Sequence, residues 1–109
     1  MKLDINGIQW IILEVEESDE HLILDGKELY GSCNYDEQKI YLLKTMSIGR
    51  KKRTLIHELV HAFAYEYLLK FKENYDNEEV CEFLSKYGER ILEIARKYID
   101  VKYLYTKGC

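Results

Sequence analysis

The segment His57-Glu58-Leu59-Val60-His61 holds the side chains of this sequence that are best suited to chemistry. Two histidines four positions apart on a helix project from one face, with roughly 5–6 Å between their Cβ atoms. Their imidazoles can therefore bind one zinc ion, which accepts ring nitrogens at about 2.0–2.1 Å. Glu58 lies beside them and can take a proton from water held by the metal. The pattern predicts a zinc site, with His57 and His61 as ligands and Glu58 as the general base.

The same pattern also arises by chance on ordinary helices. A match of this length is expected in on the order of one chain in a few hundred of this size, so the motif alone is suggestive. Its surroundings, TLIHELVHAFA, are almost wholly apolar. An ionisable group buried there without a partner costs roughly 1–3 kcal/mol, and a metal ion with its water removes that cost. This context favours a metal site over a pair of core histidines.

A catalytic zinc site needs a third protein ligand and an open position for water. Glu78 and Glu79 begin the next predicted helix, and both carboxylates are candidates. On a helical wheel Glu78 shares its face with the small residue Cys81 and with Glu82, which can accept a hydrogen bond from a ligand histidine. We expect Glu78 to bind the metal and Glu79 to close a capping box with Asp76. The alternative is that this acidic turn only complements the helix dipole.

The elements that position these residues predict an α+β domain. The first 45 residues read as strands, with a β-branched run over Ile8–Val15 and a hairpin within residues 28 to 43. A short run at residues 22–24 can pair with Ile8–Val15. We expect an N-terminal antiparallel sheet of about three or four strands, followed by two long packed helices.

Ser47 is the predicted N-cap of the helix that carries the motif. The basic run at residues 50–53 opposes the dipole of this helix, and we interpret it as a solvated helix start rather than a phosphate-binding patch. The apolar middle of the helix predicts burial in the core. The second helix is expected to run from near Asp76 to about Ile99. Its apolar stripe follows helical spacing and consists of Val80, Phe83, Leu84, Tyr87, Ile91, Ile94, Ala95 and Tyr98.

Length and composition set the remaining bounds. The chain has 109 residues, which predicts a single domain over residues 1–109, and 47% hydrophobic with 33% charged residues is typical of globular proteins. The net charge of -4 gives no general attraction to nucleic acid. The sequence shows no signal peptide and no apolar run of the ~20 residues that span a bilayer, so a cytoplasmic location is expected. Cys33, Cys81 and Cys109 are widely spaced and predict free thiols.

The chain resembles the zincin-type metallopeptidases, which carry HExxH on one helix and a glutamate on the next. More narrowly, it is similar to the ImmA/IrrE-like peptidases of phages and mobile elements. The resemblance covers roughly residues 31 to 84, through GSCNYDEQKIYLL, TLIHELVHAF and EEVCEFLS. It implies a zincin-like fold, zinc as cofactor, and Glu78 as the third ligand. Cys81 and Leu84 replace the alanine and phenylalanine that are usual in this group, while Glu82 keeps the polar position.

Motif and resemblance together predict a zinc metallo-endopeptidase that hydrolyses peptide bonds in a polypeptide, by analogy a regulatory protein such as a repressor. Lys39–Leu43 is expected to be the edge strand along which the substrate lies. One alternative is a zincin-like protein-binding module without catalysis, in which Cys33 or Cys81 closes the metal site. Another is a DNA-associated protease of the SprT type, which needs a basic surface that the overall acidity does not supply.

Other residues carry weaker indications. Tyr65, Tyr67 and Tyr87 are candidates to stabilise an oxyanion, although aromatic residues at helical spacing more often pack in the core. His21 has no partner motif and reads as a surface or strand-edge residue. Cys33 has no histidine at a diagnostic spacing, which argues against a thiol nucleophile.

Overall fold

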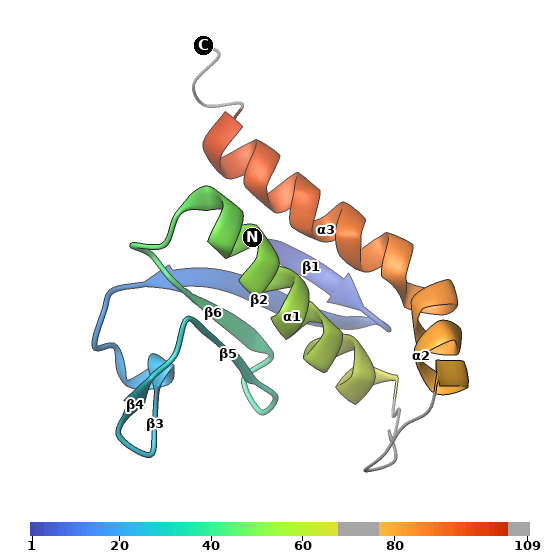
Figure 1. Cartoon of the computed structure of the whole chain (residues 1–109), viewed down its shortest axis with the longest axis horizontal. Helices are drawn as coiled ribbons and strands as arrows, with labels where there is room; N and C mark the ends of the chain where they lie inside the picture. Colours follow the sequence, from blue (N-terminus) through green and yellow to red (C-terminus); the bar gives the residue numbers. More distant parts are fainter. Residues whose placement is uncertain (68–76, 105–109) are drawn as a thin grey trace.

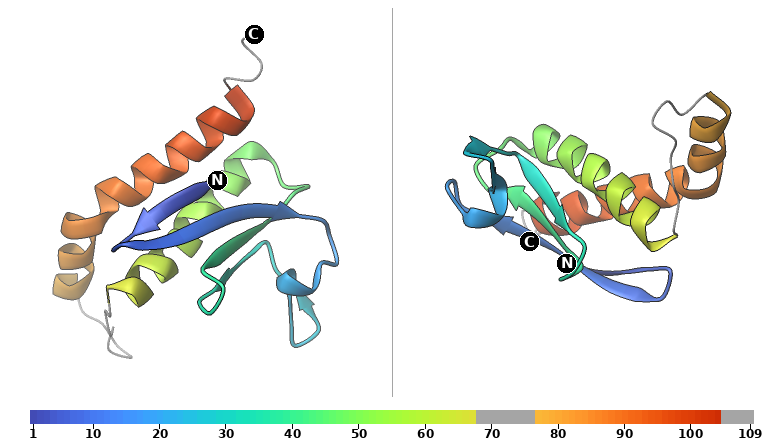
Figure 2. Two further views of the ribbon diagram at one scale, coloured as in Figure 1. Left: turned by 180° about the vertical axis from the view of Figure 1, so that it is seen from behind. Right: turned by 90° about the horizontal axis from the view of Figure 1, so that it is seen from below.

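A four-stranded sheet and two long helices form most of the molecule, as the computed structural model shows (Figure 1). The structure describes residues 1–67 and 77–104. The sheet lies on one side, and the helices cover one of its faces in both further views (Figure 2). The predicted α+β class is confirmed. The buried apolar residues of the sheet and of both helices belong to one core cluster.

The sheet has the strand order β1-β2-β6-β5 and is mixed. Two pairs, β1 with β2 and β5 with β6, are antiparallel as expected, whereas β2 and β6 run parallel. β1 and β2 are joined by Asn6 and Gly7, whose φ angles of 52° and 84° are those of a tight hairpin turn. The strands are β1 (Lys2–Ile5), β2 (Ile8–Val15), β5 (Gly31–Asn34) and β6 (Lys39–Leu43).

A small hairpin stands beside this sheet. It follows the short 3-10 helix η1 (Glu20–Leu22) and consists of β3 (Ile23–Leu24) and β4 (Lys27–Glu28). Asp25 and Gly26 form its turn, both with positive φ. The prediction that residues 22–24 pair with Ile8–Val15 is wrong, because the turn folds this run back onto β4 and β6 occupies the free side of β2.

The sheet has two edge strands, β1 and β5, and β5 is the one that lies beside Glu58 of the HExxH segment. Lys39–Leu43 was expected at this edge, but β6 lies between β2 and β5. Its central residues Ile40, Tyr41 and Leu42 are buried, and such a continuous apolar run is typical of an interior strand with a parallel partner. The prediction of Lys39–Leu43 as the edge strand is therefore wrong, and the neighbouring strand β5 forms this edge.

The helix α1 (Ile48–Glu66) carries the HExxH segment. Ser47 caps it as predicted, since its Oγ accepts a hydrogen bond from the backbone N–H of Arg50 at 3.3 Å. One side of the helix packs on the sheet, and the opposite side, with His57 and His61, is exposed. The expectation that the middle turns are buried all round is therefore wrong. The residues buried on the sheet side include Leu55, Leu59, Ala62 and Phe63.

The second helix is continuous from α2 (Asn77–Phe83) through a π-helical segment η2 (Leu84–Gly88) to α3 (Glu89–Ile99) and a final π-helical segment η3 (Asp100–Leu104). Its predicted extent is confirmed to within a few residues at the C-terminal end, while the predicted cap Asp76 lies outside the described residues. Val80 and Leu84, expected in the core, are exposed. The buried part of the stripe is Phe83, Ile91, Ile94, Ala95 and Tyr98.

A buried polar cluster joins β2, α1 and the end of the second helix. Glu14 and Lys51 lie at its centre, with Tyr98 and Tyr103 beside them. The basic run at residues 50–53 is thus not uniformly solvated, since Lys51 is buried. Among the helices of residues 1–67 and 77–104, none combines the length and the apolarity needed to cross a bilayer.

Candidate metal centre

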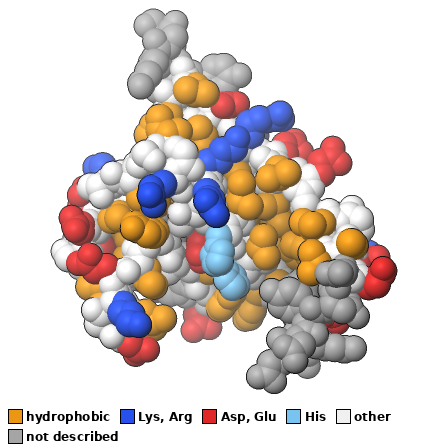
Figure 3. All heavy atoms as spheres, viewed as in Figure 1, with side chains coloured by type: hydrophobic (Ala, Val, Ile, Leu, Met, Phe, Trp, Pro, Cys, Tyr) orange, Lys and Arg blue, Asp and Glu red, His pale blue; other side chains and the backbone are white. Residues whose placement is uncertain are grey.

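His57 and His61 lie one turn apart on the exposed side of α1, where histidine side chains reach the surface in Figure 3. Their Nε2 atoms are 3.3 Å apart, and the ring planes meet at 70°. Two nitrogens that share one tetrahedral zinc ion at about 2.0–2.1 Å lie roughly 3.3–3.4 Å from each other. The pair therefore has the spacing that a shared zinc ion requires. In the absence of metal, the same distance suits a hydrogen bond between the two rings.

Glu58 completes this group from the buried side. Only 6% of the residue is exposed, yet the candidate ligand atoms of Glu58, His57 and His61 all lie within 4.8 Å of one another. Within residues 1–67 and 77–104, no group donates a hydrogen bond to its carboxylate. Burial raises the pKa of Glu58, and the charge of His57 partly offsets this effect. A buried carboxylate with free lone pairs is well placed to accept a proton from water.

The electrostatics of His61 also suit a metal ligand. Partial desolvation of the ring on the protein side lowers the pKa of this otherwise exposed imidazole, and the neighbouring charge of His57 lowers it further. A lowered pKa favours the neutral ring at neutral pH, and only the neutral ring has a lone pair to give to a metal ion.

Gly31 allows β5 to approach α1 directly beside Glu58. A Cβ atom at this position would lie 2.6 Å from Cγ2 of Thr54 and 3.3 Å from Cγ of Glu58. The first distance is shorter than real Cβ contacts allow, so a glycine is required while Thr54 stays in place. Because of this close approach, the open edge of the sheet runs next to the candidate base.

Two hollows meet at His57 and Glu58. One, of about 480 Å³, follows the edge of β5 past Cys33 and Tyr35 to the β3–β4 hairpin. The other, of about 730 Å³, extends over the first turns of α1 beside Arg50 and Arg53. Gly31 lines both hollows, so they adjoin along the edge strand. The candidate site therefore opens on the groove that these two adjoining hollows form along β5 and the first turns of α1.

The third predicted ligand, Glu78, is not part of this group. In the described part of the chain, His57, Glu58 and His61 form the only cluster of three possible metal ligands. Glu78 is exposed on α2, and Glu79 is half-buried beside it. α2 lies beyond the C-terminal end of α1, whereas His61 lies more than a turn before that end (Figure 1). The prediction of Glu78 as third ligand thus has no support in this geometry.

The two described cysteines do not close the site. Cys33 is half-buried on β5, and burial raises its pKa to about 12, with smaller contributions from Glu58 and Glu66. It is therefore a neutral thiol at physiological pH and a weak nucleophile, and it is not part of the cluster of His57, Glu58 and His61. Cys81 is exposed on α2, outside the His57 cluster. Within the described ranges, no cysteine supplies a fourth ligand.

The tyrosines divide into packing residues and residues near the groove. Tyr67 and Tyr87 have ring centroids 4.6 Å apart and both contact Phe63, so the packing interpretation fits them. Tyr65 is exposed and stacks on Tyr35 at 4.5 Å. Tyr35 lines the groove beside the histidine pair. Tyr35 lies in the turn between β5 and β6, and its place in the groove depends on a packing contact with Tyr65 that the sequence does not reveal.

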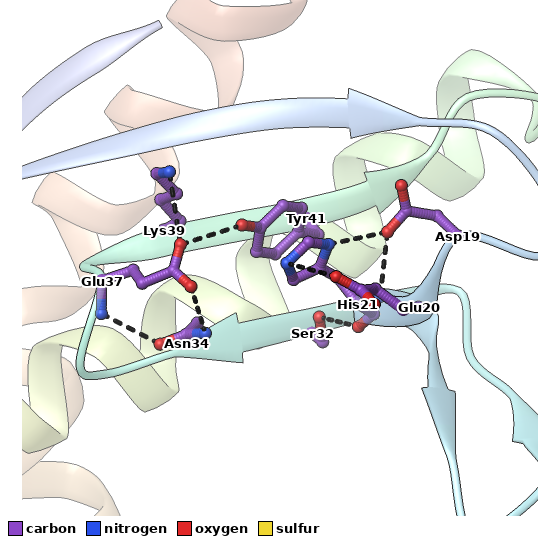
Figure 4. Close-up of polar contacts among 8 residues, drawn as sticks. All are labelled: Asp19, Glu20, His21, Ser32, Asn34, Glu37, Lys39 and Tyr41. Atoms are coloured by element: carbon purple, nitrogen blue, oxygen red, sulfur yellow. Dashed lines mark hydrogen bonds and ion pairs between the residues drawn. The ribbon is translucent and has the colours of Figure 1, made fainter.

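The third histidine, His21, belongs to a polar cluster with Asp19, Ser32 and Tyr41 (Figure 4), and it also lines the smaller hollow beside His57 and Glu58. Its ring stacks on Tyr41 with centroids 4.1 Å apart, and its Nδ1 lies 2.7 Å from Asp19. The hydroxyl of Ser32 donates to the backbone carbonyl of His21 at 2.6 Å. His21 thus links the small hairpin to the sheet, a role that its prediction as a surface or strand-edge residue did not include.

Comparison of the chain with models of protein families, with curated proteins and with solved structures found no match.

Proposed function

We propose that this chain is a zinc-dependent metallo-endopeptidase of the zincin type, with His57 and His61 as metal ligands and Glu58 as the general base. One observation carries the proposal. Two imidazole nitrogens at the spacing of shared zinc ligands lie within 4.8 Å of a buried carboxylate that has no described donor. A buried carboxylate without a hydrogen-bond donor lowers the stability of the fold. Its presence beside two histidines therefore indicates a chemical role, such as that of a base in hydrolysis.

The chemistry divides between the metal and the protein. A zinc ion held by His57 and His61 would act as a Lewis acid that polarises a carbonyl and acidifies water. Glu58 accepts a proton from the attacking water and donates it to the departing amine. The two hollows beside Glu58 give both the water and the substrate access to its carboxylate.

The edge of β5 supports a polypeptide as substrate. The backbone N–H of Leu43 donates to the carbonyl of Tyr30 at 2.9 Å, which sets the alternation of hydrogen bonds along the β5–β6 pair. In an antiparallel pair, hydrogen-bonded and non-hydrogen-bonded residues alternate along each strand. The N–H and C=O groups of Gly31 and Cys33 therefore point away from β6, towards the open edge of the sheet. An extended substrate can add to these groups as a further strand, next to Glu58.

The resemblance to the ImmA/IrrE-like group refines the proposal. It points to a regulatory protein as the substrate and to the cytoplasm as the place of the reaction. This refinement rests on the HExxH helix, the preceding hairpin and the EEVCEFLS segment.

A protein-binding module without catalysis is the second candidate function. It is favoured by the position of Glu78, which leaves the described cluster with two imidazoles and one acid but no further ligand. Such a module would bind an extended segment along β5 and release it uncut.

Proteolysis by the Glu58→Gln variant separates these functions. The zinc-loaded wild-type chain is expected to cleave a denatured, fluorescently labelled protein. Glu58→Gln is expected to lose about 10²–10⁴-fold in rate, because the amide cannot accept the proton, and to retain its zinc. Glu93→Gln removes an equal charge from exposed α3 and serves as the control. Equal cleavage by Glu58→Gln would refute this residue as the base, and binding without cleavage by the wild type would favour the module.

A further inference from the structure

The larger of the two hollows is basic on its α1 side. Arg50 and Arg53 line it together with His57 and Glu58. The positions 50, 53 and 57 fall on one side of a helix. In Figure 3, Lys or Arg side chains lie directly above the exposed histidines. Positive charge therefore adjoins the candidate catalytic group on one side only.

Neither guanidinium is neutralised by a described part of the chain. Five other basic residues have carboxylate partners within 3.4 Å. In residues 1–67 and 77–104, no carboxylate lies within ion-pair distance of Arg50 or Arg53, although the chain has 20 acidic residues. Arg50 instead lies with its Cζ 6.0 Å from the ring centroid of Tyr30, which lines the same hollow. Both cations are thus available to a ligand.

The position of Arg50 does not serve the helix. It lies in the first turn of α1, where a positive charge opposes the helix dipole at a cost of about 0.3–1 kcal/mol. Lys51, its neighbour, is held by Glu14, so its place in the fold is explained. The contacts of the described residues give no such explanation for Arg50 and Arg53.

We infer that Arg50 and Arg53 form a subsite for an acidic side chain of the polypeptide substrate, so that cleavage is directed to bonds near aspartate or glutamate. This inference rests on the proposed peptidase function. Guanidinium groups bind carboxylates through paired, charge-assisted hydrogen bonds. Gly31 lines both hollows, so a strand added along β5 passes from the Tyr35 end of the groove to the two arginines.

An acidic peptide fits this subsite better than a nucleic acid does. The neighbouring cation Lys52 lines a different hollow, together with Glu89 and Glu93 of α3. The net charge of the chain is -4, and a pair of arginines confined to one hollow does not form an extended basic track. The positive charge at the groove is therefore confined to two side chains, which suits one or two acidic side chains of a peptide.

Cleavage of a mixed peptide library, with cut sites mapped by mass spectrometry, tests this subsite. The wild-type chain is expected to cut with aspartate or glutamate enriched on the order of tenfold at one position near the cleaved bond, as expected for one charge-assisted contact. Arg50→Gln with Arg53→Gln is expected to abolish the enrichment. Arg50→Glu with Arg53→Glu is expected to shift it towards lysine and arginine.

Lys52→Gln with Lys97→Gln removes the same charge from exposed positions elsewhere and is expected to keep the acidic preference. Cleavage without acidic enrichment, or enrichment that survives Arg50→Gln with Arg53→Gln, would overturn the subsite and leave the peptidase proposal standing. No cleavage by the wild type would refute both proposals. Salt-sensitive oligonucleotide binding that depends on Arg50 and Arg53, without an acidic preference in cleavage, would assign the arginines to nucleic acid instead.

Discussion

The carboxylate of Glu14 on β2 accepts a hydrogen bond of 2.9 Å from the ammonium group of Lys51 on α1, and both side chains are almost fully buried, with 4% and 6% of their surface exposed. Tyr98 donates to the same carboxylate at 2.5 Å, and Tyr103 donates to it as well. This cluster fixes the first turns of α1, which carry Arg50 and Arg53, between the sheet and the C-terminal helix.

Replacing Glu14 by glutamine is expected to destabilise the fold strongly. The change leaves the Lys51 ammonium buried without a counter-charge, a situation that typically costs about 3–5 kcal/mol. The free energy of unfolding from urea denaturation measures the effect. Glu16→Gln breaks only the exposed pair with Lys44 and is expected to cost less than about 1 kcal/mol. Similar losses for the two variants would contradict a special role of the buried pair.

The same cluster predicts a loss of stability in acid. Burial alone would raise the pKa of Glu14, but hydrogen bonds from Tyr103, Tyr98 and Lys51 lower it from 4.5 to about 2. Because the folded pKa is depressed, the stabilisation is complete above about pH 4.5 and is lost as the pH falls towards 2. Its size is on the order of 3 kcal/mol, since one pKa unit corresponds to about 1.4 kcal/mol.

Unfolding measurements of wild type and Glu14→Gln between pH 2 and 6 check this prediction. The difference in unfolding free energy between the two proteins is expected to shrink as the pH falls through this window. A difference that stays constant down to pH 2 would show that Glu14 does not carry the acid sensitivity.

Gly31→Ala is expected to disturb the candidate site and the fold together. The added methyl group would meet Cγ2 of Thr54 at 2.6 Å, and overpacking of this kind costs about 1–3 kcal/mol. Relief of the clash moves β5 away from Glu58, so peptidase activity is expected to fall as well. Thr54→Ser removes the clashing methyl group, and the double variant is expected to recover both properties.

Gly49 supplies the control for this series. Nothing lies within 4 Å of a Cβ atom built at this position in the first turn of α1, so Gly49→Ala is expected to be neutral or stabilising. If Gly31→Ala behaved like Gly49→Ala, the close approach of β5 to α1 would not matter for stability.

Local sequence signals predicted the parts of the fold that depend on neighbouring residues. The Ser47 cap, the β5–β6 hairpin and the common face of His57 and His61 all follow from spacings of a few positions. The Asn6-Gly7 turn carries an equally local signal, because this dipeptide favours a tight hairpin turn. Secondary structure near the motif was therefore accessible from the sequence.

Contacts between distant segments were not accessible in this way. The parallel pairing of β2 with β6 depends on which strand fills the middle of the sheet, and it moved the open edge to β5. The position of α2 depends on how the second helix docks, so a helical wheel was unable to show whether Glu78 reaches His61. Arg50 and Arg53 likewise gained significance only from the hollow that they share with Glu58.

The zinc content of the purified chain tests the central claim most directly. After equilibration with zinc and removal of the excess, one ion per chain is expected in the wild type and in Glu58→Gln, because Glu58 is proposed to act on water and not to hold the metal. His61→Ala is expected to lose the ion, since a single remaining imidazole cannot hold it. Loss of zinc in Glu78→Gln as well would add that residue as the third ligand. A wild-type chain without zinc, or a His61→Ala variant that keeps a full complement, would contradict the account.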